Sequence, residues 1–381
     1  NAIGLGREHD RLNCPEAVDT LARHAGLEVP REDDGRPDRR EQLAPIYDSL
    51  AACDSWYQEQ LRKHPQATRA VEYLKGRGLT GQIAKQFGIG YAPPGWDNLL
   101  KALGKDRQQK ELLATGGMVI TKENKDYYDR FRDRIMFPIR DARGRVIAFG
   151  GRVLGDDTPK YLNSPETPAF NKSRELYGLY ESRKANRQLA QLIIVEGYMD
   201  VVALAQKGIN YAAATLGTAV GKAHLERVFR HTPKVIFCFD GDKAGRAAAG
   251  RALEATMGMM RDGRQANFLF LAEGEDPDSL VRKIGKEAFE AELAGSMSIA
   301  DFMFETLASG LDLASLDGRA RLSKLALPLI QAAPDGVFKQ LLVKELAAMV
   351  KIPSFLPPTM SRSISLCMNN EDVSTGMETA A

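Results

Sequence analysis

The chain has 381 residues, of which 44% are hydrophobic and 27% charged, and its formal net charge is only +2. This composition is ordinary for a globular protein with two or three domains, and the near-neutral charge is no global sign of a nucleic-acid partner. No apolar stretch approaches the ~18 residues of a membrane-spanning helix, and no signal peptide opens the chain. The cysteines lie far apart, at positions 14, 53, 238 and 367, and favour reduced thiols in the cytoplasm over a disulfide framework or a zinc site.

The N-terminal half shows helical periodicity that later changes to strand character. Helices are predicted over residues 10–28, 42–61, 67–75, 99–103 and 110–114. Residues 30–40 are charged and contain Pro and Gly, as expected of a linker. Strands are predicted over 134–139 and 146–149, and residues 140–145 between them predict a hairpin turn.

From about residue 191 strands alternate with helices, the pattern of a parallel α/β domain. The predicted strands are 191–195, 211–214, 234–239 and 267–271, and the predicted helices are 198–207, 221–229 and 243–257. Residues 286–350 are predicted to be helical. Their expected core positions are Phe289, Leu293, Phe302, Leu325, Leu329, Leu341 and Leu346. The tail from residue 352 has no periodicity and is predicted to be disordered.

Two of these strands are unbroken apolar runs that end in carboxylates and glycine. Glu196 and Gly197 end the first run, and Asp240-Gly241-Asp242 ends the second. Ligands bind beyond the carboxyl ends of the strands in an open parallel sheet, so we expect these carboxylates to lie together. Like charges repel by roughly 4 kcal/mol per pair at about 4 Å and an effective dielectric near 20, which cations or protonation must offset. A metal-dependent site is the simplest interpretation.

Three more carboxylates could join this cluster. Asp276 and Asp278 follow the last strand, and Asp200 lies one helical turn after Glu196. Such a group could hold two or more hard cations through oxygen ligands, as phosphoryl transfer uses them. Taken singly, an Asp-x-Asp pair after a strand is as often a turn, Asp276-Pro277-Asp278 is more often a helix N-cap, and Asp200 is more often a solvated helix residue.

These segments resemble the Toprim signature of bacterial DnaG-type primases. The matching residues are EGYMD at 196–200, DGDKAG at 240–245 and EDPD at 275–278. Further matching motifs are YAPPGWD at 91–97, DRFRDRIMFPI at 129–139, FGGR at 149–152, PKYLNSPET at 159–167, LYGL at 176–179 and DGRA at 317–320. The resemblance covers about residues 10–350, and so many motifs in one order are not expected by chance.

The resemblance implies the RNA-polymerase core of a primase, which makes short RNA primers on single-stranded DNA. A primer 3′-hydroxyl would attack the α-phosphate of a nucleoside triphosphate (NTP), with pyrophosphate leaving, while the protein supplies positioning and charge compensation. The resemblance makes Glu196, Asp240 and Asp242 the catalytic carboxylates. The residues that it implies for Mg²⁺ (or Mn²⁺) are Glu196, Asp240, Asp242, Asp276, Asp278 and Asp200. The implied partners are template DNA, RNA primer and NTPs, and no membrane is involved. The implied location is the cytoplasm, at the replication fork. The core is expected to be a monomer.

Basic residues are concentrated between positions 129 and 174, which suits a track for template and triphosphate. By the resemblance, the nucleic-acid or nucleotide contacts are Arg77, Arg152, Lys160, Tyr161, Asn163 and Lys172. Each arginine alone is more often a solvated surface residue, and Tyr161 or Phe131 alone is more often core. The clustering reverses this for Arg152 and Lys160, whereas Phe131 is expected to be packing.

Two departures from the family pattern matter. The family's N-terminal zinc domain is represented only by its tail, so zinc is expected only in that missing domain and Cys14 is interpreted as a buried apolar residue. The C-terminal helicase-interaction domain is expected to be absent, so recruitment by the replicative helicase should fail. The expected domains are a zinc-domain tail and linker (1–40), a basic α/β subdomain (41–188), a Toprim domain (189–285), a helical subdomain (286–351) and a tail (352–381), giving an α/β fold that is α+β overall.

Two alternatives remain. Another Toprim enzyme, a topoisomerase or nuclease, would use the same carboxylates to cleave DNA, but a topoisomerase needs a nucleophilic Tyr in a larger DNA gate. A non-catalytic nucleic-acid-binding module would show gaps in the acidic cluster, and none is apparent in the sequence.

Overall fold

The computed structural model describes residue 22 and residues 39–123, 126–155 and 158–351. The chain divides into two units after Ala44, and the fold below is that of the unit that begins at Pro45. Except for residue 22, the predicted helix over 10–28 lies outside the described residues, as do most of the predicted linker and the tail. Within the described part, no helix is long and apolar enough to cross a membrane.

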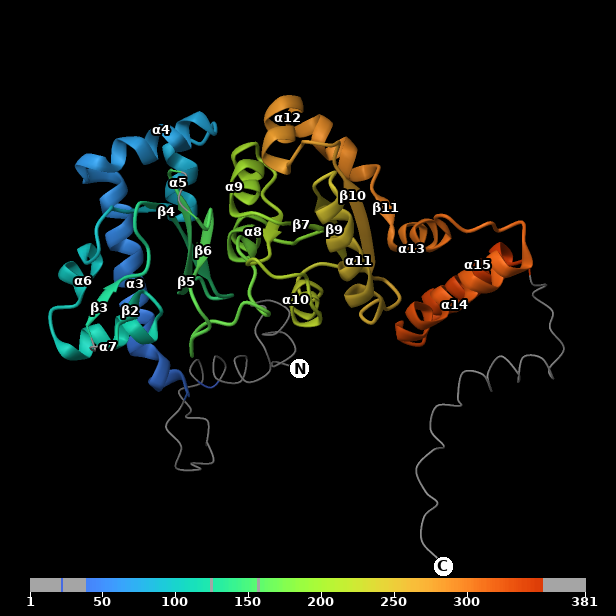
Figure 1. Ribbon diagram of the computed structural model, residues 1–381, viewed down its shortest axis with the longest axis horizontal. Helices are drawn as coiled ribbons and strands as arrows, with labels where there is room; N and C mark the ends of the chain where they lie inside the picture. The colour runs from blue at the N-terminus through green and yellow to red at the C-terminus, as the bar shows by residue number, and fades with distance from the viewer. Residues whose placement is uncertain (1–21, 23–38, 124–125, 156–157, 352–381) are drawn as a thin grey trace, which may run out of the picture. The chain divides into compact units, whose positions relative to one another are not determined.

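The first part of this unit is built on a four-stranded antiparallel sheet with the strand order β1-β4-β5-β6 (Figure 1). Its strands are β1 (Gly90–Ala92), β4 (Arg134–Arg140), β5 (Val146–Val153) and β6 (Tyr161–Asn163). The predicted hairpin is confirmed, since β4 and β5 pair antiparallel with Arg134 opposite Val153. The strands β1 and β6 were not predicted, because three residues are too few to show an alternating pattern.

Helices surround this sheet, and we call residues 45–185 the antiparallel region. Its helices are α3 (Arg39–Lys63, which begins before the unit boundary), α4 (Thr68–Gly76), α5 (Gly81–Phe87), α6 (Asn98–Leu103), α7 (Arg107–Thr115) and α8 (Leu179–Ala185), with a 3-10 turn η1 (Pro65–Ala67). A two-stranded ribbon pairs β2 (Val119–Thr121) with β3 (Tyr127–Asp129). The predicted helices over 42–61, 67–75, 99–103 and 110–114 are confirmed, and α5 is additional.

Residues 192–298 form a five-stranded sheet, the parallel region, with the order β11-β10-β9-β7-β8. The strands are β7 (Leu192–Val195), β8 (Ala212–Ala214), β9 (Lys234–Phe239), β10 (Gln265–Phe270) and the antiparallel edge strand β11 (Met297–Ser298). The helices are α9 (Tyr198–Gln206), α10 (Lys222–Val228), α11 (Lys243–Met257) and α12 (Pro277–Ala294). The predicted parallel α/β domain is confirmed, and β7 to β10 and α9 to α11 start and end within a few residues of the prediction. The helix α12 begins nine residues earlier than the predicted start at 286, and β11 was not predicted.

Alternate residues of the central strands enter two different cores. Ile193, Val195 and Ile236 belong to a core that also contains Phe137 of β4, whereas Leu192 and Phe237 belong to a core with residues of α11 and of the helix α13 (Ile299–Ala308). Side chains of a strand alternate between its faces, so a strand buried on both faces must be apolar throughout. This burial explains the unbroken apolar runs that precede the carboxylates.

Three helices follow the parallel region: α13 (Ile299–Ala308), α14 (Leu316–Ala332) and α15 (Val337–Met349). Their helical character is as predicted. The assignment of Leu325 and Leu341 to the core is wrong, since both are exposed, while Leu322 and Leu342 are buried instead. A long helix with apolar residues on more than one side does not reveal which side meets its neighbours until the packing is known.

Candidate active site

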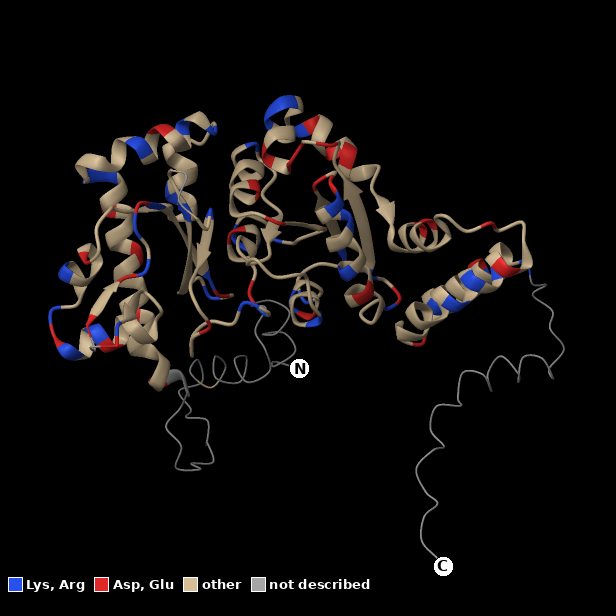
Figure 2. Cartoon of the chain, in the orientation of Figure 1, with Lys and Arg blue, Asp and Glu red and all other residues tan. Residues whose placement is uncertain are grey.

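The carboxyl ends of β7 and β9 place two of the predicted carboxylates at one edge of the parallel sheet. The strands are direct parallel neighbours, with Ile194 opposite Phe237, so Glu196 and Asp240 leave the sheet at the same edge. Figure 2 shows acidic residues at this end of β9 and β10, close to α12. The position agrees with the general rule that ligands bind beyond the carboxyl ends of parallel strands.

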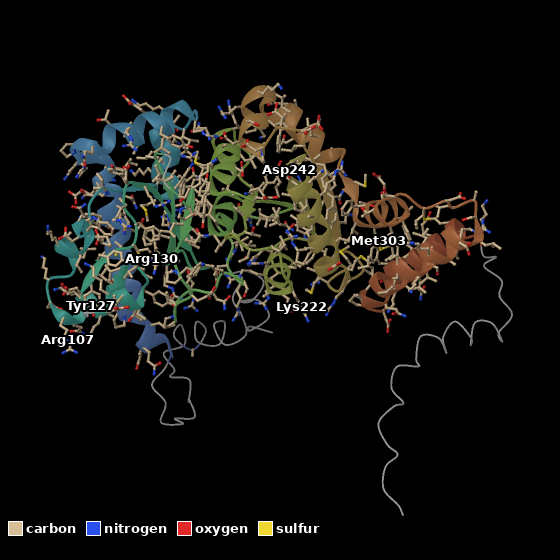
Figure 3. All side chains as sticks on the ribbon, in the orientation of Figure 1. Arg107, Tyr127, Arg130, Lys222, Asp242 and Met303 are labelled. Carbon is tan, nitrogen blue, oxygen red and sulfur yellow. The ribbon has the colours of Figure 1, made fainter. Side chains whose placement is uncertain are left out.

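The Asp-Gly-Asp segment makes a tight turn from β9 into α11. Asp242 is the N-cap of α11 and accepts a hydrogen bond from the Gly245 backbone N–H at 2.7 Å. A Cβ at Gly241 would collide with the carbonyl oxygen of Leu271, and one at Gly245 with that of Asp240. Close backbone approach therefore requires both glycines. Asp242, labelled in Figure 3, keeps its side chain exposed at the sheet edge.

The third acidic segment opens α12. Asp276 is its N-cap and accepts from the Ser279 backbone N–H at 2.6 Å, as the N-cap interpretation predicts. Asp278 is only 1% exposed, and guanidinium groups occupy both of its carboxylate oxygens. The Asp278 Oδ2 to Arg77 Nη1 distance is 2.6 Å, and the Oδ1 to Arg282 Nε distance is 2.8 Å. A cation at Asp278 would have to share these oxygens with two arginines.

We call Glu196, Asp240 and Asp242 the acidic edge. Burial and nearby negative charges disfavour the ionised form of several carboxylates there. Burial, together with the charges of Glu196 and Asp276, raises the pKa of Asp240 to about 6. Burial also raises the pKa of Asp200 to about 8, with Asp276 and Asp240 adding to the effect. Burial and the charge of Asp242 raise the pKa of Glu196. Like charges close together in a partly buried site produce such shifts.

Oxygen atoms that repel one another are suitable ligands for a hard divalent cation, whose charge would reverse these pKa shifts. Asp200 is already partly committed, because its Oδ2 accepts from the Gly197 N–H at 3.1 Å and its Oδ1 from the Asp278 N–H at 3.3 Å. Among the described residues, no three His, Cys, Asp or Glu side chains converge as a ready-made metal site. The donor set therefore fits Mg²⁺ or Mn²⁺ in chemistry, with side-chain rearrangement needed for binding.

The buried side chain of Arg152 has no carboxylate partner in the described part of the chain. Arg152 lies on β5 and is 9% exposed, and its Nε atom is buried without a hydrogen-bond partner. Its guanidinium lies over the ring of Tyr73, 4.2 Å from the centroid, and 5.8 Å from the centroid of Tyr161. Burying an uncompensated charge is costly, so such a group indicates an anionic ligand.

The other predicted contact residues have different surroundings. Asn163 donates to the Leu216 carbonyl at 2.9 Å and accepts from the Tyr198 hydroxyl at 2.6 Å, so it joins β6 to the parallel region. Lys160 is exposed, just before β6. The backbone carbonyl of Lys172 accepts a hydrogen bond from Nε2 of buried His224 at 2.8 Å.

Three comparisons with known proteins address the family. Residues 56–183 match the model of the DNA primase catalytic core, N-terminal domain, and residues 190–267 match the Toprim domain. A crystal structure of a DNA primase domain from Pseudomonas aeruginosa has a TM-score of 0.79 and 53% sequence identity, over 81% of this chain and 96% of that one. The chain belongs to the DnaG primase family. A structure of the DnaG primase catalytic domain bound to single-stranded DNA matches with a TM-score of 0.79 and 52% identity, over 82% of this chain and 98% of that one.

Full-length relatives of this DnaG-family chain are considerably longer. The DNA primase of Pseudomonas putida is 57% identical over 347 residues, which are 90% of this chain and 52% of the relative. The Escherichia coli DNA primase is 52% identical, over 91% of this chain and 60% of the relative. The chain thus spans about half the length of the curated relatives that it matches.

The comparisons correct one expectation. Residues 300–354 match the model of the DnaB-helicase binding domain of primase, so the prediction that the helicase-interaction segment is absent is wrong. These residues correspond to α13–α15, which the periodicity identified only as helices. Amphipathic periodicity reveals that a helix packs somewhere and carries no information about an external partner.

The structure also adds two residues that the sequence analysis missed, Tyr73 and Arg282. Tyr73 and Arg77 are four residues apart at the end of a predicted helix, so the helical spacing could have indicated that they are neighbours. Arg282 follows Asp278 at the same spacing on α12. The contact between Tyr73 and Arg152 joins distant parts of the sequence, and no local pattern could have indicated it.

Proposed function

We propose that this chain is a primase catalytic core, which synthesises RNA primers on single-stranded DNA by divalent-cation-dependent nucleotidyl transfer. The main support is that one unit contains both the acidic edge at Glu196, Asp240 and Asp242 and Arg152, a buried guanidinium without a carboxylate partner in the described part of the chain. Cation-binding and phosphate-binding groups together are what nucleotidyl transfer requires. The identity to DnaG catalytic-core structures supports the same reaction.

On the acidic side, Glu196, Asp240, Asp242 and Asp276 are the proposed ligands of Mg²⁺ or Mn²⁺. Asp200 and Asp278 are proposed as supporting residues, since both are already bonded to protein groups. When bound, the cation would neutralise charge that develops on the transferring phosphoryl group. Asp242 and Asp276 also cap α11 and α12, which fixes the backbone around the carboxylates. Asp278 holds Arg77 and Arg282, so it organises the start of α12 as well.

On the basic side, Arg152 and Lys160 are the proposed contacts to the triphosphate or the nucleic-acid backbone. Tyr161 is suited to stacking on a sugar or base, and burial raises the pKa of its hydroxyl to about 12, so it stays protonated as a donor. Asn163, Lys172 and Arg77 contribute chiefly through the position of their segments, since these residues are bonded to Tyr198, His224 and Asp278.

The direct test is incorporation of labelled ribonucleotides on a single-stranded DNA template, with and without Mg²⁺. We expect cation-dependent RNA products that disappear in Asp240→Asn. Cleavage of the template without RNA synthesis would identify a Toprim nuclease instead. Binding of DNA with neither reaction would identify a nucleic-acid-binding module. Sedimentation of the same sample tests the expected monomer.

A second function rests on the match of residues 300–354. We propose that α13–α15 contact a DnaB-type helicase through the exposed apolar side chains of α14 and α15. These are Leu316, Leu325, Val337, Leu341 and Val343. Exposed apolar residues clustered on two neighbouring helices are typical of a protein interface. Leu325→Ser with Leu341→Ser should weaken helicase binding in pull-down or calorimetry without changing primer synthesis, and unchanged binding would contradict this surface.

A further inference from the structure

The ring of Tyr73, on α4, holds two arginines that come from different parts of the chain. Arg152 of β5 lies with Cζ 4.2 Å from the ring centroid, and Arg77, at the end of α4, lies at 5.6 Å. Two neighbouring guanidinium groups repel each other, and the negative face of an aromatic ring offsets part of that repulsion. Tyr73 therefore contacts two guanidinium groups, of which Arg77 is paired with Asp278 and Arg152 has no carboxylate partner in the described part of the chain.

Both members of the closer pair have an unsatisfied polar atom. The Tyr73 hydroxyl and the Arg152 Nε are buried, and neither has a hydrogen-bond partner in the described part of the chain. Buried polar groups are nearly always bonded, to protein, water or ligand. Two unsatisfied atoms on one stacked pair indicate that a polar ligand completes the group.

An aromatic ring holds a guanidinium differently from a carboxylate. A carboxylate would neutralise Arg152 and compete with an incoming phosphate for the same N–H groups. The Tyr73 ring orients the guanidinium plane and leaves its charge and its edge available. Arg140 of β4, by contrast, is paired with Glu181 at 2.6 Å.

We propose that Tyr73 is a positioning residue for the nucleoside triphosphate: its ring holds Arg152 ready to bind phosphate, and its hydroxyl is available to a polar atom of the ligand. Arg77 is fixed from the other side by Asp278, so the stack connects α4 to the start of α12 and the acidic edge. The inference rests on the proposed function and adds a residue that it does not include.

The test compares Tyr73→Leu and Tyr73→Phe with the wild type. Tyr73→Leu removes the ring, and we expect the Kd for a fluorescent ATP analogue with Mg²⁺, and the KM for NTPs, to rise about tenfold. Tyr73→Phe keeps the ring and should stay within about threefold of the wild type. In both variants kcat at saturating NTP should change by less than about twofold, because the loss is in ground-state binding.

Tyr47→Leu is the matched control. The Tyr47 ring holds Arg145 at 4.0 Å in the same way, and that arginine has its own carboxylate, Asp141. We expect this variant to leave nucleotide affinity unchanged. In an Arg152→Gln background, Tyr73→Leu should add little further loss, because the two residues act as one unit.

Wild-type nucleotide affinity in Tyr73→Leu would overturn the inference, as would an equal loss in Tyr47→Leu or an additive loss in the Arg152→Gln background. If Tyr73→Leu fails to fold, Tyr73→Met, which fills more of the ring volume, takes its place with the same expected result. A wild-type chain that binds no nucleotide would overturn the proposed function and the inference together, whereas normal wild-type binding with an unaffected Tyr73 variant would overturn the inference alone.

Discussion

Buried charges are paired with opposite charges in the antiparallel region, whereas carboxylates lie near other carboxylates at one edge of the parallel region. In the antiparallel region Arg140 is bonded to Glu181 and lies near Asp54, so the charges are compensated inside the protein. At the edge of the parallel region, by contrast, carboxylates lie near other carboxylates, and the pKa values of Asp240 and Glu196 are raised. Compensated charges stabilise a fold, and uncompensated charges of one sign mark a place where a ligand of opposite charge binds.

Each region contains one exception that connects it to the other. Arg152 is a buried cation of the antiparallel region that has no carboxylate partner among the described residues, whereas Asp278 is an acidic residue of the parallel region with both oxygens bonded to arginines. Arg152 contacts Tyr73 of α4, and Asp278 at the start of α12 is bonded to Arg77 at the end of α4. The comparison therefore predicts that substitutions in the two regions separate activity from stability.

The largest expected effect is on activity, from Asp240→Asn. Losing one carboxylate charge at the acidic edge should lower primer synthesis by about a thousandfold. Because the wild-type carboxylate is repelled by its neighbours, the variant should be at least as stable toward urea as the wild type. Exposed Asp335→Asn serves as the control and should change neither quantity. An active Asp240→Asn variant would remove the acidic edge from the mechanism.

Arg140→Gln should lower stability and leave primer synthesis unchanged. It leaves Glu181 and Asp54 buried without their counter-charge, so the free energy of unfolding should fall by about 3 kcal/mol. Urea titration measures this loss, and adding Glu181→Gln with Asp54→Asn should recover most of it. A loss of activity at unchanged stability would mean that this triad belongs to the site and that the comparison fails.

A smaller effect concerns the pH dependence of stability at Asp129. This residue is buried and accepts from the backbone N–H groups of Leu99 and Leu100 at 2.7 and 3.0 Å, and burial raises its pKa to about 6. The folded state thus holds the proton more tightly than the unfolded state. Wild-type stability, compared with Asp129→Asn, should be greatest near pH 4 and should fall by about 2 kcal/mol as the pH rises past 6.

Urea titrations of both proteins at several pH values between 4 and 7 measure this difference. A constant difference between wild type and variant over that range would show that Asp129 has an ordinary pKa, and that the two backbone hydrogen bonds fully compensate its burial.

The smallest effect is expected from Arg145→Gln. Arg145 pairs with Asp141 at 2.7 Å near the surface, where water screens the interaction. The free energy of unfolding should fall by less than about 1 kcal/mol, and primer synthesis should be unchanged. A loss as large as that of Arg140→Gln would show that exposure does not separate strong from weak ion pairs in this region.

Local sequence patterns were enough to predict the parallel α/β domain and the acidic edge. Apolar runs with carboxylates at their ends identify β7 and β9, and strands that run parallel bring their carboxyl ends to one edge wherever the rest of the chain lies. Glu196, Asp240 and Asp242 could therefore be predicted from local patterns. Short strands such as β1 and β6 could not, because three residues do not establish a period.

Which charges are compensated depends on the packing of segments that are far apart in the sequence. Arg282, four residues after Asp278, is a local partner for one oxygen, but the other oxygen is occupied by Arg77, two hundred and one residues away. In the same way, exposed Leu341 and buried Leu342 are adjacent on α15 and differ only in what packs against them. Ion pairs and burial depend on contacts between distant segments, and local periodicity carries no information about those contacts.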